Sequence, residues 1–177
     1  MARIKNTRTP FSIDFGVGDV IVPKQEKRKI PTQLDDFAAP VVNTYSLETT
    51  IAEKIDAILS LMEFSSRMKD YYDIYYLANK FDFDGKVLTE ALKKTFENRG
   101  HTFTIEQFEQ VMSFADDSAM QKKWKAFCRK IDTQTDDFST VLRTIKVFLT
   151  RPFIAVLSKT EFSQQWIAAE TQWKKGV

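Results

Sequence analysis

The sequence has a single cysteine, Cys128, a single histidine, His101, and only five glycines and five prolines in 177 residues. One cysteine excludes a framework of intramolecular disulfides, and one histidine without a neighbouring cysteine excludes an ordinary zinc site. No apolar run approaches the ~20 residues that cross a bilayer, and the basic N-terminus is not followed by the apolar stretch of a secretory signal. We therefore expect a cytoplasmic protein without membrane contact.

An excess of one charge sign is also lacking, since the formal net charge is only +2. The whole chain therefore gives no electrostatic indication of a nucleic-acid or acidic-membrane partner. Of its residues, 43% are hydrophobic and 28% are charged. This composition is typical of one soluble domain with a substantial core.

Residues 46 to 62 have the pattern of an amphipathic helix. Ser46 can cap its first turn. The apolar residues that follow recur at helical spacing: Leu47, Ile51, Ile55, Ile58 and Met62. Lys54 falls at the border of this stripe, whereas Glu53 and Asp56 are predicted to point away from it. The ammonium of Lys54 is therefore expected close to the core.

A second helical pattern, over residues 67 to 81, carries a carboxylate on its apolar face, which consists of Tyr71, Ile74, Leu77, Ala78 and Phe81. Asp70 stands on this face, and Asp73 lies about 60° away from it by the helical wheel. A buried carboxylate must be paired, protonated or part of a solvated pocket, because an isolated buried charge costs several kcal/mol. Two interpretations stay open: a structural Lys54–Asp70 ion pair assisted by Arg67, and an active site.

The N-terminal part predicts a small β-sheet. Residues 11 to 17 alternate between apolar and polar or glycine residues, which indicates a strand, and residues 20 to 22 extend it. Asp14 lies on the other face beside two glycines, where it suits a metal ion or a phosphate, or is a solvent-facing carboxylate of an edge strand. Residues 24 to 39 are interpreted as a charged loop and residues 40 to 46 as a short strand. Two or three strands make an incomplete sheet.

Helix-start signals recur in the remaining sequence. Asp82 and Asp84 form a D-x-D pattern, but they directly precede an apolar helical pattern and are assigned to its start. Thr104 and Gln107 form a capping box for a later helix. His101 is assigned to the connection before that helix.

Three patterns follow toward the C-terminus. Residues 121 to 131 predict a basic helix whose aromatic side chains share the buried face, so we expect a solvated charged surface rather than an RNA-binding one. Residues 138 to 149 give the clearest helical pattern, which Pro152 is expected to end or bend. A terminal helix is predicted from the spacing of Phe162, Trp166, Ala169 and Trp173. The sequence thus predicts a mostly helical α+β protein, with a small, incomplete N-terminal sheet followed by a C-terminal helical bundle.

Several of these segments resemble the nucleotidyltransferase toxins of the AbiEii/AbiGii family, from type IV toxin–antitoxin and abortive-infection systems. The matching segments, in the family's order, are SIDFGVGDVIVP at 12 to 23, AEKIDA at 52 to 57, RMKDYYDIYYL at 67 to 77, and W-x-x-F-C followed by FSTVLRTIKVFLTRPF from 124 to 153. The resemblance covers nearly the whole chain, and the first three of these segments, which are the motifs, are together moderately specific.

The resemblance implies roles for four residues. Asp14 corresponds to a metal-binding aspartate, Lys54 to a lysine that contacts phosphate, and Asp70 and Asp73 to an acidic motif that orients the lysine or the acceptor. It also implies Mg²⁺ or Mn²⁺ and an NTP as cofactors. The family's first motif, a Gly-Ser turn with two aspartates, is missing, because the sequence contains no Gly-Ser dipeptide. Residues 1 to 45 would then be a remnant of the nucleotidyltransferase sheet, and residues 46 to 177 a helical domain.

Two classes of function are therefore expected. The first is the C-terminal part of a nucleotidyltransferase toxin that acts on RNA such as tRNA and is inactive alone. The second is a non-catalytic helical interaction module derived from such an enzyme. The expected partners are a cognate antitoxin or regulator, tRNA as acceptor, and a second copy of the chain paired through the edge of the N-terminal strand.

Overall fold

The computed structural model describes residues 2–4, 7–10, 18–64, 67–131 and 135–175. Within these ranges lie six α-helices: α1 (Leu47–Leu61), α2 (Met68–Lys80), α3 (Gly85–Arg99), α4 (Ile105–Ser113), α5 (Ser118–Ile131) and α6 (Phe138–Ser158). Short 3₁₀ turns follow α1 and α4, as η1 (Met62–Phe64) and η2 (Phe114–Asp116), and a third, η3 (Ala168–Glu170), lies between two strands near the C-terminus. The prediction of a mostly helical α+β fold is confirmed.

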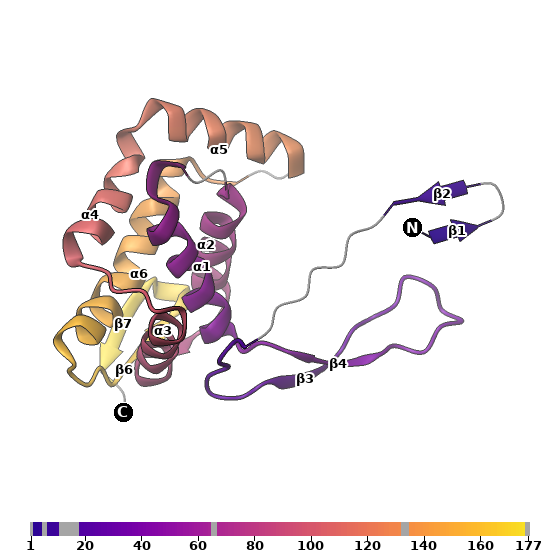
Figure 1. Ribbon diagram of the computed structural model, residues 1–177, viewed down its shortest axis with the longest axis horizontal. Helices are drawn as coiled ribbons and strands as arrows, with labels where there is room; N and C mark the ends of the chain where they lie inside the picture. Colours follow the sequence, from indigo (N-terminus) through magenta and orange to yellow (C-terminus); the bar gives the residue numbers. More distant parts are fainter. Residues whose placement is uncertain (1, 5–6, 11–17, 65–66, 132–134, 176–177) are drawn as a thin grey trace.

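The strands form small antiparallel sheets in different parts of the molecule. Two are hairpins, β1 (Ala2–Ile4) with β2 (Thr7–Thr9) and β3 (Glu26–Lys29) with β4 (Val41–Thr44). The third sheet has the order β5 (Phe83–Asp84), β6 (Gln164–Ile167) and β7 (Gln172–Lys175). Figure 1 shows both N-terminal hairpins projecting away from a compact helical body. The residues of this body, from α1 onward, carry the core.

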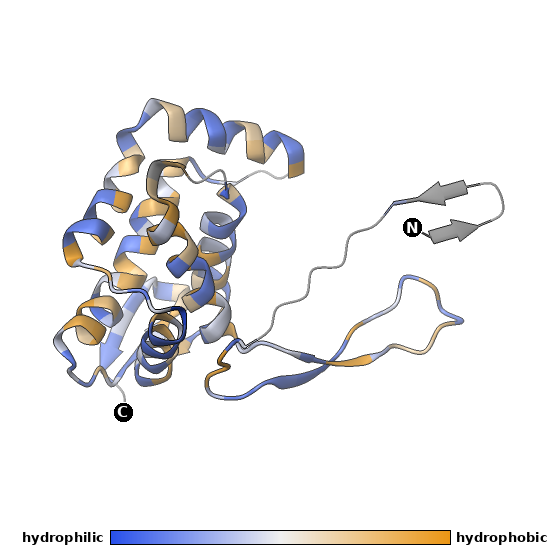
Figure 2. Ribbon diagram, viewed as in Figure 1, coloured by the Kyte–Doolittle hydropathy of each residue, from blue (hydrophilic) through white to orange (hydrophobic). Residues whose placement is uncertain are grey.

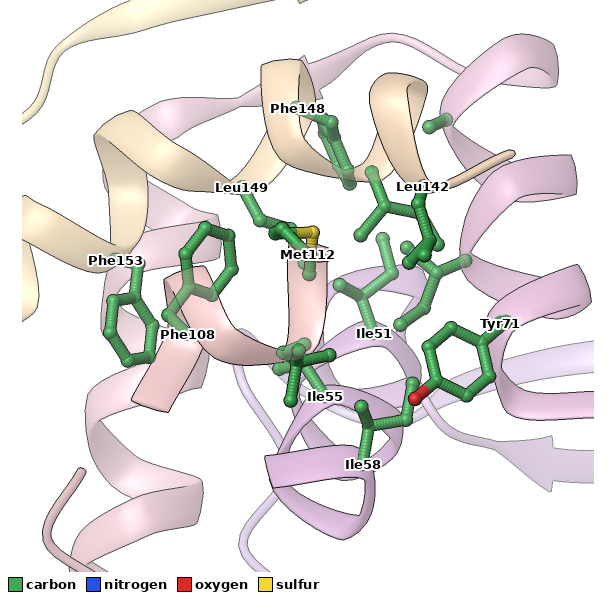
Figure 3. Close-up of a cluster of buried hydrophobic side chains, with 14 of the residues drawn as sticks. Ile51, Ile55, Ile58, Tyr71, Phe108, Met112, Leu142, Phe148, Leu149 and Phe153 are labelled. Atoms are coloured by element: carbon green, nitrogen blue, oxygen red, sulfur yellow. The ribbon is translucent and has the colours of Figure 1, made fainter. Parts of the chain in front are cut away.

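Helix α1 lies at the centre of the body, packed against α2 and α3, while α6 packs against α2, α3 and α4. The buried face of α1 meets aromatic and aliphatic side chains of α2, α4 and α6 (Figure 3). The shared core includes Ile51, Ile55, Ile58, Tyr71, Phe108, Met112, Leu142, Phe148, Leu149 and Phe153. Helical spacing places these residues on inward faces, and burial of each large side chain contributes about 1.5–3 kcal/mol.

The prediction that residues 20 to 22 continue a strand is wrong. Residues 18–22 have no strand structure, because their backbone bonds to α1 and α3 instead of to another strand. The Val22 N–H donates to Thr49 Oγ1 at 2.8 Å, its carbonyl accepts from the Ser46 hydroxyl, and Asn98 donates to the carbonyl of Gly18 at 3.0 Å. The rest of the predicted strand, residues 11 to 17 with Asp14, lies outside the described residues.

The charged stretch from 24 to 39 also differs from the predicted loop, since β3 occupies part of it. The strand pairs with β4, which confirms the short strand predicted over residues 40 to 46. All four residues of β3 are exposed, so their charges remain solvated. Cross-strand hydrogen bonds rather than burial therefore hold this hairpin together.

The C-terminal segment is a β-hairpin, not the predicted terminal helix. Its two tryptophans are buried, and each indole N–H reaches a helix carbonyl. Trp166 Nε1 donates to the carbonyl of Ala78 in the last turn of α2 at 2.7 Å, and Asp82 accepts from the N–H of Ala168 at 2.8 Å. The carbonyls of a helix's last turn have no partner within the helix, so the hairpin caps α2.

Pro152 is expected to end or bend its helix, and it does not end it. Helix α6 continues to Ser158, with Pro152 inside it. Proline has no N–H to give to the carbonyl four residues earlier, which is that of Phe148. That carbonyl accepts instead from Trp173 Nε1 at 2.8 Å. The hairpin indole thus replaces the hydrogen bond that Pro152 removes.

Candidate active site

The candidate site is built on the α1–α2 helix pair. Ser46 caps α1 as predicted, because its hydroxyl accepts from the N–H of Thr49 at 3.1 Å. Met62, with a φ of 48°, ends α1, and α2 begins at Met68 and packs back along α1. One short connection therefore sets the two charged faces opposite each other.

Lys54 of α1 reaches two carboxylates of α2. Its Nζ lies 3.1 Å from Asp70 Oδ1 and 2.5 Å from Asp73 Oδ2. Each carboxylate has a second cation, since Arg67 Nε lies 2.5 Å from Asp70 Oδ2 and Lys69 Nζ lies 3.0 Å from Asp73 Oδ2. The predicted approach of Lys54 to Asp70, assisted by Arg67, is confirmed, and Asp73 joins it.

The burial of these groups is graded from the core outward. The side chain of Asp70 is 3% exposed, that of Lys54 16% and that of Asp73 22%. The ammonium of Lys54 is thus fixed from the inside by a buried carboxylate, while the lysine side chain stays partly exposed. Three cations, those of Lys54, Arg67 and Lys69, surround the two carboxylates.

This cluster does not fit a divalent metal. Both of its carboxylates already neutralise cations, and the described part of the chain contains no group of three or more His, Cys, Asp or Glu side chains that could hold a metal ion. Asp14, the candidate metal ligand, lies outside the described residues. Any metal role therefore stays with Asp14 as a prediction from the family resemblance.

The D-x-D pair at 82 and 84 serves structure, as the sequence indicates. Asp84 caps α3 by accepting from the N–H groups of Lys86 at 2.8 Å and Val87 at 3.2 Å. Asp82 accepts from the N–H of Ala168. Thr104 and Gln107 likewise form the predicted capping box of α4, with both hydrogen bonds present.

Asp56 contradicts its predicted outward orientation, since it is fully buried. Its carboxylate lies 3.0 Å from Nη1 of Arg99, at the end of α3, and 2.8 Å from Nδ1 of His101. Burial raises the pKa of the Asp56 carboxyl, and the hydrogen bond with His101 opposes this shift. His101, assigned to a loop, is therefore part of an ion-pair cluster that joins α1 to α3.

A sequence signal for Asp56 does exist. Ala52 lies four residues before it and Leu59 three residues after it, and both are buried beside it on the helix face. The buried face of α1 is therefore wider than its isoleucine stripe. A charge between two apolar neighbours at this spacing indicates a buried, paired group.

A cavity of about 640 Å³ lies elsewhere, between α3, the end of α6 and the 101–103 connection. Phe96, Phe103 and Phe162 are among the residues that line it, and Lys54, Asp70 and Asp73 are not. The candidate site is therefore a charged cluster separate from this cavity.

No helix in the described ranges is long and apolar enough to cross a membrane.

The model of the AbiEii nucleotidyl transferase toxin family, of the type IV toxin–antitoxin systems, matches residues 1–144. The chain belongs to this family. The match includes α1 and α2 with the Lys54 cluster, and it ends inside α6. No curated protein and no solved structure matches the chain. AbiEii membership agrees with the resemblance seen in the sequence and implies an antitoxin as the partner in the system.

Proposed function

We propose that this AbiEii chain supplies the phosphate-binding part of a nucleotidyltransferase toxin. The observation that carries the proposal is the position of Lys54, whose ammonium is held by two carboxylates while its side chain stays partly exposed. A lysine held in this way is oriented before the ligand arrives. Little side-chain entropy is then lost when a phosphate binds.

The residues of the cluster have distinct proposed roles. Lys54 contacts the phosphates of an NTP, Asp70 fixes its ammonium from the core side, and Asp73 orients it from the rim or positions the acceptor hydroxyl. Mg²⁺ or Mn²⁺, held through Asp14 and the carboxylates of the family's first motif, would neutralise the triphosphate and activate the attacking hydroxyl. The acceptor in this proposal is RNA, such as the 3′ end of tRNA, and the protein acts in the cytoplasm.

We further propose that the chain alone does not transfer nucleotides. It contains no Gly-Ser dipeptide, and Asp14 is one carboxylate where about three hold a metal pair. The first motif must come from a preceding segment or from another chain, unless the protein is non-catalytic. In this proposal residues 1 to 45 are the remnant of the catalytic sheet and residues 46 to 177 form the helical domain.

Two measurements test the proposal. Titration with ATP and Mg²⁺ should show binding that Lys54→Met weakens about tenfold or more, because a charge-assisted hydrogen bond is lost, while Lys54→Arg retains part of it. Lys125→Met, on the exposed face of α5, is the control. Equal ATP affinity of the Lys54→Met variant and the parent chain would contradict the role of Lys54.

The second measurement incubates the chain with tRNA, Mg²⁺ or Mn²⁺ and each labelled NTP, and we expect no label on the RNA. Incorporation that disappears in the Asp14→Ala variant would show that the chain is active alone. The metal site would then be completed by carboxylates that we assign to other roles.

A non-catalytic interaction module is the alternative function. Large apolar side chains are exposed in the connection between β3 and β4 and at the start of β4, where Leu34 and Phe37 are each 60% exposed and Val41 is 63% exposed. Figure 2 colours parts of this hairpin as hydrophobic. Such side chains suit a protein partner, either the cognate antitoxin or a second copy paired through a free strand edge. Sedimentation of the chain alone and with antitoxin distinguishes these partners. If Leu34→Ser with Phe37→Ser abolishes the association while no NTP binds, the alternative is correct.

A further inference from the structure

An exposed aromatic face lies on α2 beside the Lys54 cluster. The rings of Tyr72 and Tyr76, one helical turn apart, are stacked with centroids 6.2 Å apart and an angle of 24° between their planes. Tyr76 is 49% exposed, so one large aromatic surface is open to solvent.

This face packs against aromatic side chains of α5 through Tyr72. The ring of Tyr72 lies 5.9 Å from that of Phe127 on α5, and Phe127 lies 5.5 Å from the ring of Trp124. Trp124 is buried, and its indole N–H donates to the carbonyl of Asp136 at 3.0 Å. A continuous row of rings thus connects the exposed Tyr76 to the core, which limits the freedom of the outer ring.

The position of the two tyrosines along α2 relates them to Lys54. Asp73, which holds the Lys54 ammonium, directly follows Tyr72 and precedes Tyr76 by three residues. Residues three apart on a helix have Cβ atoms about 5–6 Å apart. Lys69 lies one turn before Asp73, and Lys80 lies one turn after Tyr76. Both lysines are on the same face of α2 as Tyr76. The aromatic surface therefore begins next to Asp73, the carboxylate that contacts the Lys54 ammonium, and is flanked by two lysines.

We propose that Tyr76, supported by Tyr72, is a stacking subsite for the base of a nucleotide whose phosphates contact Lys54. The inference rests on the proposed function. Anion and aromatic recognition lie side by side on one rigid helix pair, and a nucleotide carries both chemistries. Stacking does not depend on base identity, but a purine offers the larger surface, so purine nucleoside triphosphates are the ligands of choice.

The experiment compares ATP with inorganic tripolyphosphate, both with Mg²⁺, on the full chain. Tripolyphosphate has the charge but no base, so the ratio of the two affinities measures the contribution of the base. In the parent chain ATP should bind about tenfold or more tightly than tripolyphosphate. Tyr76→Ala should remove this preference and leave tripolyphosphate binding unchanged, whereas Tyr76→Phe should retain it. Phe81→Ala, another partly exposed aromatic residue next to α2, should change neither affinity.

The two proposals fail in different ways. If Tyr76→Ala keeps the full preference for ATP, Tyr76 only covers Tyr72 and the stacking subsite is wrong. If Lys54→Met leaves tripolyphosphate affinity unchanged while Tyr76→Ala still removes the ATP preference, the stacking subsite stands and the phosphate role of Lys54 falls. If neither compound binds, both proposals are wrong.

Discussion

Arg99, the last residue of α3, places Nη1 3.0 Å from Oδ2 of Asp56, a carboxylate of α1 that is fully buried. The same guanidinium also pairs with Glu53 through Nη2. One arginine at a helix end thus compensates two carboxylates of the central helix. Since Asp56 has left water completely, its partners decide whether its burial can be tolerated.

Replacing Arg99 by methionine should therefore destabilise the protein by about 2 kcal/mol or more, because Asp56 keeps its desolvation cost and retains only His101. Urea unfolding at neutral pH measures the change. Arg129→Met removes an exposed arginine from the last turn of α5 and should shift the unfolding free energy by no more than about 0.5 kcal/mol. Equal effects of the two variants would contradict the importance of the Asp56 pair.

The raised pKa of Asp56 gives a pH dependence of known sign. In the folded state its carboxyl holds a proton at pH values where the unfolded chain has lost it. Its contribution to stability is therefore fully present below the ordinary aspartate pKa of about 4 and decreases as pH rises through the folded value. The unfolding free energy of the parent chain minus that of Asp56→Asn should fall as pH rises from about 4 toward neutrality. A difference that grows with pH would show that the ion pairs outweigh burial.

Removal of Lys54 alone should cost only about 1–2 kcal/mol, because Arg67 continues to compensate Asp70. The double variant Lys54→Met with Arg67→Met leaves a buried carboxylate with neither of these cations. Its loss of unfolding free energy should exceed the sum of the two single losses. Chemical denaturation of the parent chain, the two single variants and the double variant measures these losses. Additive losses would mean that the two cations act independently of Asp70.

The indole of Trp173 should matter because of Pro152. Trp173→Phe removes the donor to the Phe148 carbonyl and should destabilise by about 1–3 kcal/mol. In a Pro152→Ala background the backbone N–H at position 152 can bond to that carbonyl, so the same Trp173→Phe change should cost less. Thermal unfolding of the parent chain, the two single variants and the double variant measures the coupling between positions 152 and 173. If Trp173→Phe destabilises equally with Pro152 present and in the Pro152→Ala background, the two positions are not coupled.

The basic surface of α5 should not bind RNA specifically. Trp124 is buried against Phe138 and Phe127 is half-buried against Tyr72, so neither is free to stack on a base. Changing Lys122, Lys123 and Lys125 together to glutamate should leave tRNA affinity unchanged in a filter-binding assay. A salt-sensitive affinity that this triple variant abolishes would contradict the prediction.

Features determined within one helical turn could be predicted from the sequence. Ser46, Asp84 and the Thr104–Gln107 box all act on backbone N–H groups two or three residues away, so the local pattern contains the whole interaction. The proximity of Lys54 and Asp70 was also predictable, because two adjacent apolar stripes must face each other and carry their charges together. The roles of these residues, and that of Asp14, stay predictions.

Features that depend on distant partners could not be predicted. Phe162, Trp166, Ala169 and Trp173 are spaced as on a helix, yet carbonyls of α2 and α6 select a hairpin by accepting from the two indoles. The burial of Asp56 has a local signal in Ala52 and Leu59, but its partner does not, because the cation that compensates it lies 43 residues away in the sequence. In both cases the polar bond joins segments that are distant in the sequence.

The placement of the tryptophans limits what intrinsic fluorescence can report. All three lie in α5 and the C-terminal hairpin, at positions 124, 166 and 173, and all three are buried. Unfolding of the helical body exposes all three indoles to water, so their emission should change strongly. The β3–β4 hairpin, which contains no tryptophan, is silent in that signal, so its rearrangement on meeting a partner would need a label or a spectroscopic probe of its own.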